Sequence, residues 1–165
     1  MKRVKFFVLM LIAIVSLTLY TSCNKANPDT TAAYNFELVT LEGQKITLDD
    51  FKGKVLLLDF WDTWCPPCKA EIPHFVELYS KYNAEGFEIL GVAFGRDGQE
   101  VVNNFLQDYN VNYINALANR DIVNGYGGIT SIPTTFLIDK KGNIIKKYVG
   151  YNDKSVFEND IKTIL

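Results

Sequence analysis

The sequence predicts an α/β fold in which helices flank a central mixed β-sheet, with a β-hairpin added at the N-terminal end. A strand, a helix and a second strand follow one another over residues 55–94, which predicts parallel strands joined by a right-handed crossover. Residues 135–139 and 144–149 surround a Lys-Lys-Gly-Asn turn, which predicts an antiparallel hairpin. The length of 165 residues fits one globular domain with an appendage.

The appendage is the N-terminal segment, 1–22. Three basic residues precede a mostly apolar run, 6–20, and two small residues, Thr21 and Ser22, follow it. This layout is typical of a secretory signal peptide. The alternative, a permanent membrane anchor, needs about 20 apolar residues, more than this run contains. We therefore predict that residues 1–22 are a signal peptide.

The residues around Cys23 resemble a bacterial lipobox, over positions 19–24. In such signals the cysteine is diacylated and becomes the new N-terminus. This resemblance implies a lipoprotein tethered to the membrane on the extracytoplasmic, periplasmic side, because two or three acyl chains anchor firmly. Tyr20 departs from the usual Leu or Val, which leaves ordinary cleavage open. Residues 23–33 are predicted to be a flexible tether before the domain, 34–165.

Net charge and cysteine content reduce the number of functions that the chain could have. Without the signal, 14 basic residues stand against 19 acidic ones, a net charge of −5, and no basic patch is present. Nucleic acid is therefore not an expected partner. Only Cys65 and Cys68 lie in the domain, and a loop this short adds little stability when it is closed. We expect these cysteines to serve chemistry in a compartment where disulfides form.

The elements up to the first long helix follow from periodicity and turn residues. Residues 36–39 and 46–48 predict a hairpin, and 48–53 predict one helical turn closed by Gly53. The continuous apolar run 55–61 predicts a central strand buried on both faces. Residues 66–83 have helical spacing, in which Pro73 is expected to interrupt and kink the helix.

The remaining elements alternate between sheet and helix. Residues 89–94 predict a strand and 101–109 an amphipathic helix, while 111–118 are ambiguous and 121–128 combine a helical turn with a loop. After the 135–149 hairpin, a final helix is expected over 153–165. The residues expected to face inward from it are Val156, Phe157, Ile161 and Ile164.

The Cys-x-x-Cys motif follows a strand and opens a helix, which is a redox signature. A helix N-terminus favours an anion, so Cys65 is expected to form the reactive thiolate as an exposed nucleophile. Cys68, one turn later, is the expected buried resolving thiol. Because Pro66 and Pro67 have no N–H, Cys68 is also the expected backbone donor to the Cys65 sulfur.

A metal half-site is the alternative use of the two cysteines. A zinc site usually needs four ligands, and the chain offers one further candidate, His74. This histidine is better explained as an ordinary helix residue, with a role in tuning the site as the other option. We predict no metal and no cofactor besides the redox-active disulfide.

Two motifs, at 64–68 and 131–136, together resemble the thioredoxin superfamily, and most closely its exported TlpA/ResA-like thiol-disulfide oxidoreductases. The resemblance covers residue 34 to the C-terminus and implies the thioredoxin fold. It implies that Pro133 forms a cis bond with Ile132 and that this loop faces the disulfide and binds extended substrate; a trans proline opening a strand is the alternative. Trp64 matches the residue that shields the first cysteine, whereas Trp61 is assigned to the core.

Three carboxyl groups lie near the motif in sequence. Glu71 matches the family pattern Cys-x-x-Glu-x-Pro, which implies a role in proton transfer. Asp59 matches the buried acid of thioredoxins, and burial would raise its pKa for general base work on Cys68; a solvated strand end is the alternative. Asp62 departs from the small residue usual in the family, and we expect a solvated surface residue, or else a carboxylate that opposes thiolate formation.

The resemblance implies an enzyme that exchanges disulfides with extracytoplasmic protein thiols. It favours the reducing direction, as in cytochrome c maturation, with a transmembrane thiol reductase as partner, and a monomer. One alternative is a peroxiredoxin-like thiol peroxidase, but its Pro-x-x-x-Thr-x-x-Cys frame is missing, and Asp62 stands at the threonine position. The other is a copper chaperone, whose wider cysteine spacing and distant histidine are not matched by His74.

Overall fold

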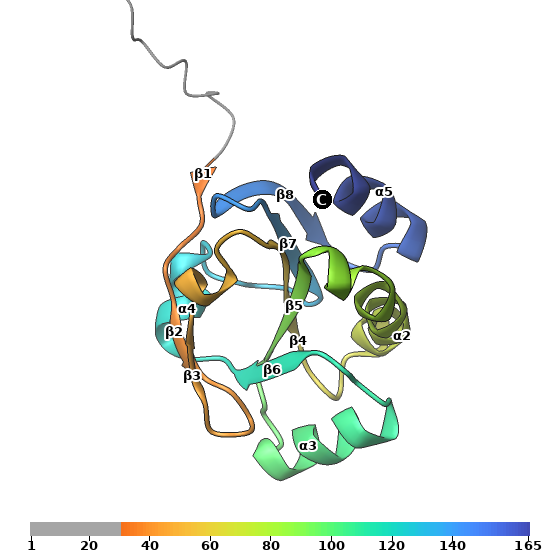
Figure 1. Ribbon diagram of the computed structural model, residues 1–165. Helices are drawn as coiled ribbons and strands as arrows, with labels where there is room; N and C mark the ends of the chain where they lie inside the picture. The colour runs from red at the N-terminus through yellow and green to blue at the C-terminus, as the bar shows by residue number, and fades with distance from the viewer. Residues whose placement is uncertain (1–30) are drawn as a thin grey trace, which may run out of the picture.

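A six-stranded mixed sheet, in the order β1-β8-β7-β4-β5-β6, forms the centre of the domain (Figure 1). The computed structural model describes residues 31–165. β4 pairs in parallel with β5, and β5 with β6, while β7, β8 and β1 continue the sheet antiparallel on the other side. The strands are β1 (Thr31–Ala32), β4 (Val55–Trp61), β5 (Phe87–Ala93), β6 (Ile114–Leu117), β7 (Thr134–Ile138) and β8 (Asn143–Val149). The predicted mixed sheet is confirmed.

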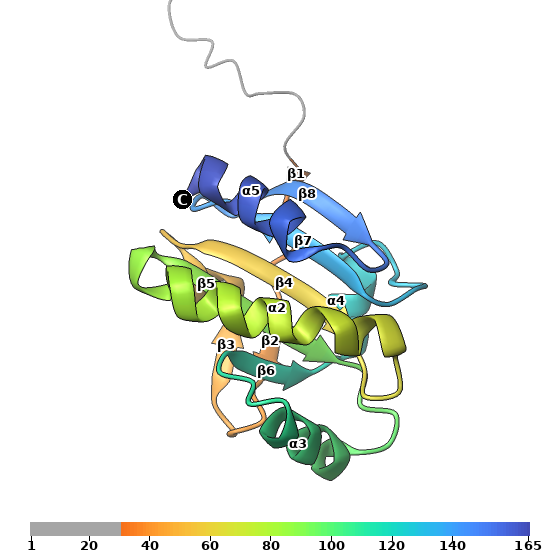
Figure 2. The ribbon, with the colours of Figure 1, turned by 90° about the vertical axis from the view of Figure 1, so that its right-hand side faces the viewer.

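Two helices cover one face of this sheet, as Figure 2 shows: α2 (Pro66–Tyr82) and α5 (Lys154–Ile164). The other face carries a hairpin of β2 (Glu37–Val39) and β3 (Lys45–Thr47), the 3-10 turn η1 (Leu48–Phe51), and α4 (Arg120–Gly125). A further helix, α3 (Gln99–Asp108), packs near the active-site end of β4 and β5. A 3-10 turn, η2 (Asn83–Glu85), leads from α2 into β5.

β4 supplies both cores because successive side chains of a strand point to opposite faces. Leu56, Leu58 and Phe60 join the core under the hairpin and α4. Val55 and Leu57 join the core under α2 and α5. All seven residues of the strand are buried, as the continuous apolar run predicted. This alternation places the odd-numbered residues of β4, including Asp59, on the α2 face.

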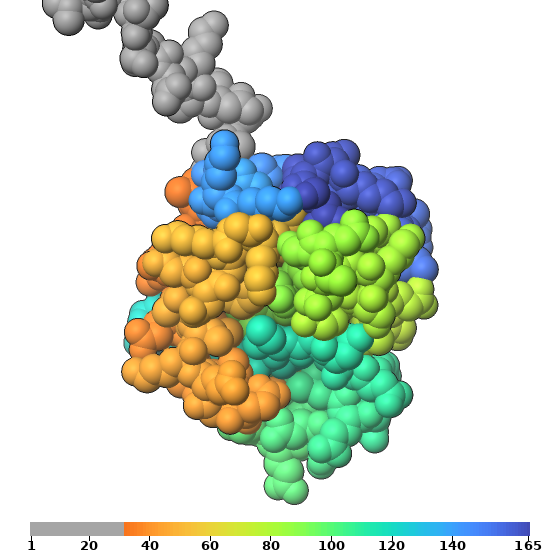
Figure 3. Space-filling view, viewed as in Figure 1, coloured from red at the N-terminus to blue at the C-terminus, as the bar shows by residue number. Residues whose placement is uncertain are grey.

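The predicted N-terminal hairpin is present and closes one face of the molecule. β2 and β3 pair antiparallel, and Leu38 opposite Ile46 is buried against the sheet. A bridge between Thr40 and Ala116 ties the hairpin to β6. In the space-filling view, this orange segment lies directly against the teal surface of the sheet domain (Figure 3).

Two features differ from those predicted. β1 pairs Thr31 with Ile144 of β8, so the sheet takes in residues 31–33, which the sequence assigned to the tether. α2 continues through Pro73 to Tyr82, so the predicted interruption is wrong. The lost N–H costs only the bond to the Lys69 carbonyl, and Pro73 itself is exposed, where its ring meets solvent.

The last elements agree with the expectations in type. The ambiguous stretch 111–118 contains β6, and 121–128 contains all of α4 except its first residue, followed by a glycine-rich loop. On α5, Phe157 and Ile161 are buried, whereas Val156 and Ile164 pack only at the edge of the core. Within residues 31–165, the helices are too short or too polar to cross a membrane. The predicted signal peptide and Cys23 lie outside the described residues.

Candidate active site

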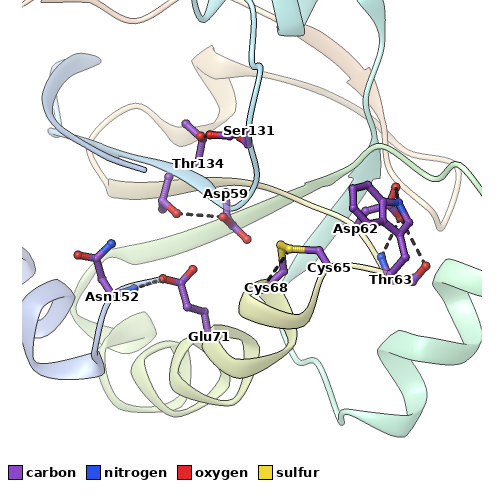
Figure 4. The surroundings of a disulfide bond; sticks show 11 residues. Asp59, Asp62, Thr63, Cys65, Cys68, Glu71, Ser131, Thr134 and Asn152 are labelled. Atoms are coloured by element: carbon purple, nitrogen blue, oxygen red, sulfur yellow. Dashed lines mark hydrogen bonds between the residues drawn. A yellow bond between two sulfur atoms is a disulfide. The ribbon is translucent and has the colours of Figure 1, made fainter. Parts of the chain in front are cut away.

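Cys65 and Cys68 form a disulfide at the N-terminus of α2, with their Cα atoms 5.3 Å apart (Figure 4). Cys65 is the N-cap of the helix, and the Cys68 backbone N–H donates to its sulfur at 3.2 Å. Pro66 and Pro67 occupy the first two helical positions and have no N–H to donate. The predicted single backbone donor to the Cys65 sulfur is therefore confirmed.

The two cysteines are equally buried, although the sequence predicted that Cys65 would be exposed and Cys68 buried. Cys65 is 2% exposed and Cys68 1%, so the description of Cys65 as an exposed thiol is wrong for this oxidised form. Both cysteines pack in a cluster with Trp61, Ile72 and Phe105. What distinguishes Cys65 is its place at the N-cap, where the helix dipole favours a thiolate.

Asp59 lies on β4 behind the disulfide and is 2% exposed, which excludes the solvated strand end. The Thr135 hydroxyl, opposite it on β7, donates to its Oδ1 at 2.9 Å. Burial raises the pKa of Asp59 to about 7, and the hydrogen bond from Thr135 opposes part of that rise. Near neutral pH both the protonated and the ionised form of this carboxyl are therefore populated, so it can donate or accept a proton.

Glu71 lies one helical turn after Cys68 and is 1% exposed. The Asn152 backbone N–H donates to its Oε1 at 2.5 Å, while its buried Oε2 has no partner among residues 31–165. Burial and then the charge of Asp59 raise the pKa of Glu71 to about 8, against the opposing hydrogen bond from Asn152. The two carboxyls are thus coupled, and Figure 4 shows both on the disulfide's side of the sheet.

The loop before β7 lies across from the disulfide. The Ile132–Pro133 peptide bond is cis, as predicted. Ile132 packs against the cluster that contains both cysteines. The Gly150 N–H donates to the Pro133 carbonyl, which ties the loop to the end of β8. Trp64 is 47% exposed beside Cys65, whereas Trp61 is 1% exposed in the core, as their predicted roles require.

The expectation of a solvated Asp62 is wrong, because this side chain is fully buried. Its Oδ1 accepts from the Thr63 N–H at 2.8 Å. Its Oδ2 accepts from the Trp64 indole N–H at 2.8 Å and from the Arg96 backbone N–H at 3.4 Å. These donors, which come from the active-site loop and from the loop after β5, replace the water that the carboxylate gives up.

Four contributors to the site escaped the sequence interpretation: Thr135, Asn152, Asn115 and Arg96. The sequence places Thr135 in a predicted strand just after Pro133, but the pairing of that strand with β4, which brings Thr135 to Asp59, is seen only in the structure. Asn115 accepts from the Trp61 indole N–H at 3.2 Å, and a side chain at Gly91 would clash with both residues. Asn152 and Arg96 lie in loops, where no sequence period predicts direction.

His74 does not join the disulfide site. Its ring lies 6.1 Å from that of Tyr151, and its buried Nδ1 has no partner among residues 31–165. Within the same range, no group of three or more His, Cys, Asp or Glu side chains is placed to hold a metal ion. The site therefore consists of a disulfide, two carboxyls with raised pKa values and a cis-proline loop.

Comparison with known proteins agrees with this geometry. The AhpC/TSA family matches residues 30–147. Thiol-disulfide oxidoreductase ResA of Bacillus anthracis is 40% identical over 133 residues, which are 80% of this chain and 76% of that protein. The protein of the same name from Bacillus subtilis (strain 168) is 33% identical over 160 residues, 94% of this chain and 88% of the relative.

Solved structures give the same result. A thiol:disulfide interchange protein from Chlorobium tepidum TLS superposes with a TM-score of 0.77 at 32% identity, covering 84% of this chain and 99% of that one. StoA from Bacillus subtilis superposes with a TM-score of 0.67 at 29% identity, covering 78% and 98%. The chain therefore belongs to the AhpC/TSA family of the thioredoxin superfamily, as a ResA-like thiol-disulfide oxidoreductase.

Proposed function

We propose that this protein reduces disulfides in exported proteins, with Cys65 as nucleophile and Cys68 as resolving thiol. The observation that carries the direction is the surroundings of the Cys65 sulfur. This sulfur accepts one backbone hydrogen bond, from Cys68, because the two prolines before Cys68 have no N–H to donate. Three buried carboxyls, Asp59, Asp62 and Glu71, lie around the active-site loop. A thiolate gains little stabilisation there, so the reduced form is the less favoured one. A dithiol of this kind passes its electrons on readily.

The carboxyls Asp59 and Glu71 supply the proton transfers of this reaction. The Cys65 thiolate attacks a substrate disulfide, forms a mixed disulfide, and releases one substrate sulfur as a thiolate, which takes up from solvent a proton equivalent to the one that Cys65 lost. The ionised form of Asp59 or Glu71 then accepts the Cys68 proton, since their pKa values of about 7 and 8 lie near working pH. The Cys68 thiolate attacks the Cys65 sulfur, the bond between Cys65 and the substrate breaks, and the second substrate sulfur leaves with the proton that the carboxyl accepted. The substrate gains two electrons and two protons.

The equilibrium potential of the Cys65–Cys68 pair against glutathione tests the direction. We expect a value near that of thioredoxin, about −270 mV. A value near that of the strong oxidant DsbA, about −120 mV, would instead assign the protein to disulfide donation. In a dithiol-coupled insulin assay, Cys65→Ser should abolish reduction, and retained activity would contradict the nucleophile assignment. Cys68→Ser should accumulate the mixed disulfide, because nothing remains to resolve it.

The cellular setting is part of the same proposal. The signal-like segment and Cys23 support a lipoprotein on the extracytoplasmic side of a membrane. There a disulfide of apocytochrome c would be the substrate, and a transmembrane thiol reductase the electron donor. The net charge of the exported chain and its single cysteine pair suit that setting. Cys23→Ala should move the protein from the membrane fraction to the soluble fraction. An unchanged distribution would count against lipid anchoring.

A further inference from the structure

A hollow of about 370 Å³ lies beside the disulfide, between the active-site loop and the cis-proline loop. This volume is within the range of small ligand pockets, about 300–1,000 Å³. One side is Trp64, next to Cys65, and the other includes Ile132, next to Pro133. The lining residues are Trp64, Phe94, Arg96, Ile129, Thr130, Ser131 and Ile132. A polypeptide bound with its disulfide at Cys65 would therefore have neighbouring residues close to this hollow.

The pocket is apolar apart from hydroxyls and one charge, the Arg96 guanidinium. Its Cζ lies 5.2 Å from the centre of the exposed Trp64 ring, in a cation–π contact. Arg96 forms no ion pair with any carboxylate among residues 31–165. A guanidinium that is exposed, oriented and not neutralised can bind a carboxylate through its planar donors.

We propose that this pocket selects substrates that carry an apolar side chain and a carboxylate close to the reacting cysteine. Phe94, Ile129 and Ile132 would contact the apolar side chain, and Arg96 the carboxylate. The proposal rests on the proposed function and names the substrate class of that site. Arg96 is the one charged side chain among the residues that line this pocket.

Asp62 is the positioning residue of this pocket. Through Oδ2 it holds the Trp64 indole and the Arg96 backbone at the same time, so the two residues that form the cation–π pair share one buried anchor. Its Oδ1 holds the Thr63 N–H, which fixes the loop between β4 and Cys65. An asparagine there has only one acceptor oxygen, so it cannot satisfy both sets of N–H donors.

The first experiment compares two synthetic peptides, each closed by one internal disulfide and carrying Leu beside a cysteine. They differ in one further residue, Glu in one and Lys in the other. With the reduced mature protein, kcat/KM should favour the Glu peptide by about fivefold, the size expected of one exposed ion pair. The preference should shrink as salt is raised. Equal rates at low salt would overturn the proposal.

Variants test the residues. Arg96→Glu should reverse the preference, whereas Lys141→Glu should leave the preference as it is. Lys141 provides a matched control, because it makes the same charge change on an exposed residue at the far end of β7. A preference that shifts equally in both variants would mean that only overall charge matters, and the proposal would fail.

The Asp62→Asn variant tests positioning. It should raise KM for the Glu peptide more than it lowers kcat, and it should shift the NMR signal of the Trp64 indole N–H while that of Trp61 stays. A variant with lower thermal stability but unchanged indole signal and peptide preference would refute the positioning role. If the wild type reduces insulin but both peptides equally, only the pocket proposal fails. If it reduces neither insulin nor peptide, the proposed function fails as well.

Discussion

Asp59 is a residue whose chemistry is set by its neighbours in the sheet. The side chain points to the α2 face because it shares the odd positions of β4 with Leu57 and Trp61. Its cross-strand partner Thr135 supplies one hydrogen bond, and no cation compensates its charge among the described residues. Because the carboxyl is buried and no cation lies beside it, its pKa is raised and it can hold a proton near neutral pH.

The raised pKa of Asp59 makes the stability of the oxidised protein depend on pH. Between the unfolded pKa, near 4, and about 7, the folded state holds a proton that the unfolded state has lost. Stability from this group is therefore full below pH 4 and is lost as pH rises through 7. At pH 9, Asp59→Asn, which keeps the acceptor for Thr135, should be more stable to urea unfolding than wild type by about 4 kcal/mol, since the two pKa values differ by about three units.

At pH 5 the difference should shrink to about 1 kcal/mol, because Asp59 is still neutral in the fold and pH 5 lies only about one unit above the unfolded pKa. Asp97→Asn is the matched control, since Asp97 is exposed and should show no such pH-dependent difference. An Asp59→Asn stability difference that is the same at both pH values would show that Asp59 is ionised at pH 5 as well as at pH 9.

Pro67 limits the stabilisation of the Cys65 thiolate. An N-cap side chain usually accepts from the second or third helical N–H, and here the second position is proline. Pro67→Ala adds that donor. We expect the Cys65 pKa to fall by about one unit and the potential to rise by roughly 30 mV, as a hydrogen bond to a charged group implies.

Thiolate absorbance and glutathione equilibration measure these two quantities. Pro73→Ala is the control, because it adds an N–H to the same helix more than one turn away from the sulfur. An unchanged Cys65 pKa in Pro67→Ala would show that the second helical N–H does not reach the sulfur.

Among the elements, helix α2 begins at the active-site cysteines and contains a proline, Pro73, in its interior. Its buried side packs Ile72, Phe75 and Leu78 under the sheet. That packing compensates the broken hydrogen bond at Pro73, so the helix continues where propensity alone predicts a break. The active-site residues Cys68 and Glu71 lie on the turn before the proline.

Pro73→Ala should therefore stabilise the oxidised protein by about 1 kcal/mol, since it restores a helical hydrogen bond on an exposed surface. Urea unfolding of the variant and the wild type measures this difference. A loss of stability would show instead that the packing of α2 depends on the local geometry that the proline imposes.

At the scale of the whole molecule, β1 extends the sheet beyond the expected domain start. The Ala33 N–H donates to the Gly142 carbonyl at 2.9 Å, and Ala33 packs against the core under the hairpin. This short strand covers part of β8, which would otherwise be a free edge. The last residues of the predicted tether, 31–33, therefore contribute to folding.

A chain that begins at Tyr34 should be less stable than one that begins at Thr31, by about 1–2 kcal/mol, because it loses the pairing of β1 with β8. Thermal unfolding compares the two chains. Ala32→Ser in the longer chain is the control, since it keeps the backbone pairing and should retain stability. Equal stability of the two chains would mean that β1 adds nothing to the fold.

The sequence by itself determined the elements of the fold, the redox pair and the cis-proline loop. Hydrophobic period, turn residues and the two motifs are local signals, and they placed Asp59 in a buried strand and Cys68 as donor to Cys65. Besides Asp62, the departures lie where packing overrides local preference: β1, Pro73 and the exposure of Cys65.

Only the tertiary structure decided that Asp62 is buried and which groups form hydrogen bonds with the catalytic carboxyls. A carboxylate in a loop is usually solvated, and Asp62 is buried only because donors from Thr63, Trp64 and Arg96 meet there from two separate loops. The contact of Glu71 with Asn152 likewise joins residues 81 positions apart. Such contacts between distant loops depend on the tertiary arrangement of the chain, and no local pattern in the sequence predicts them.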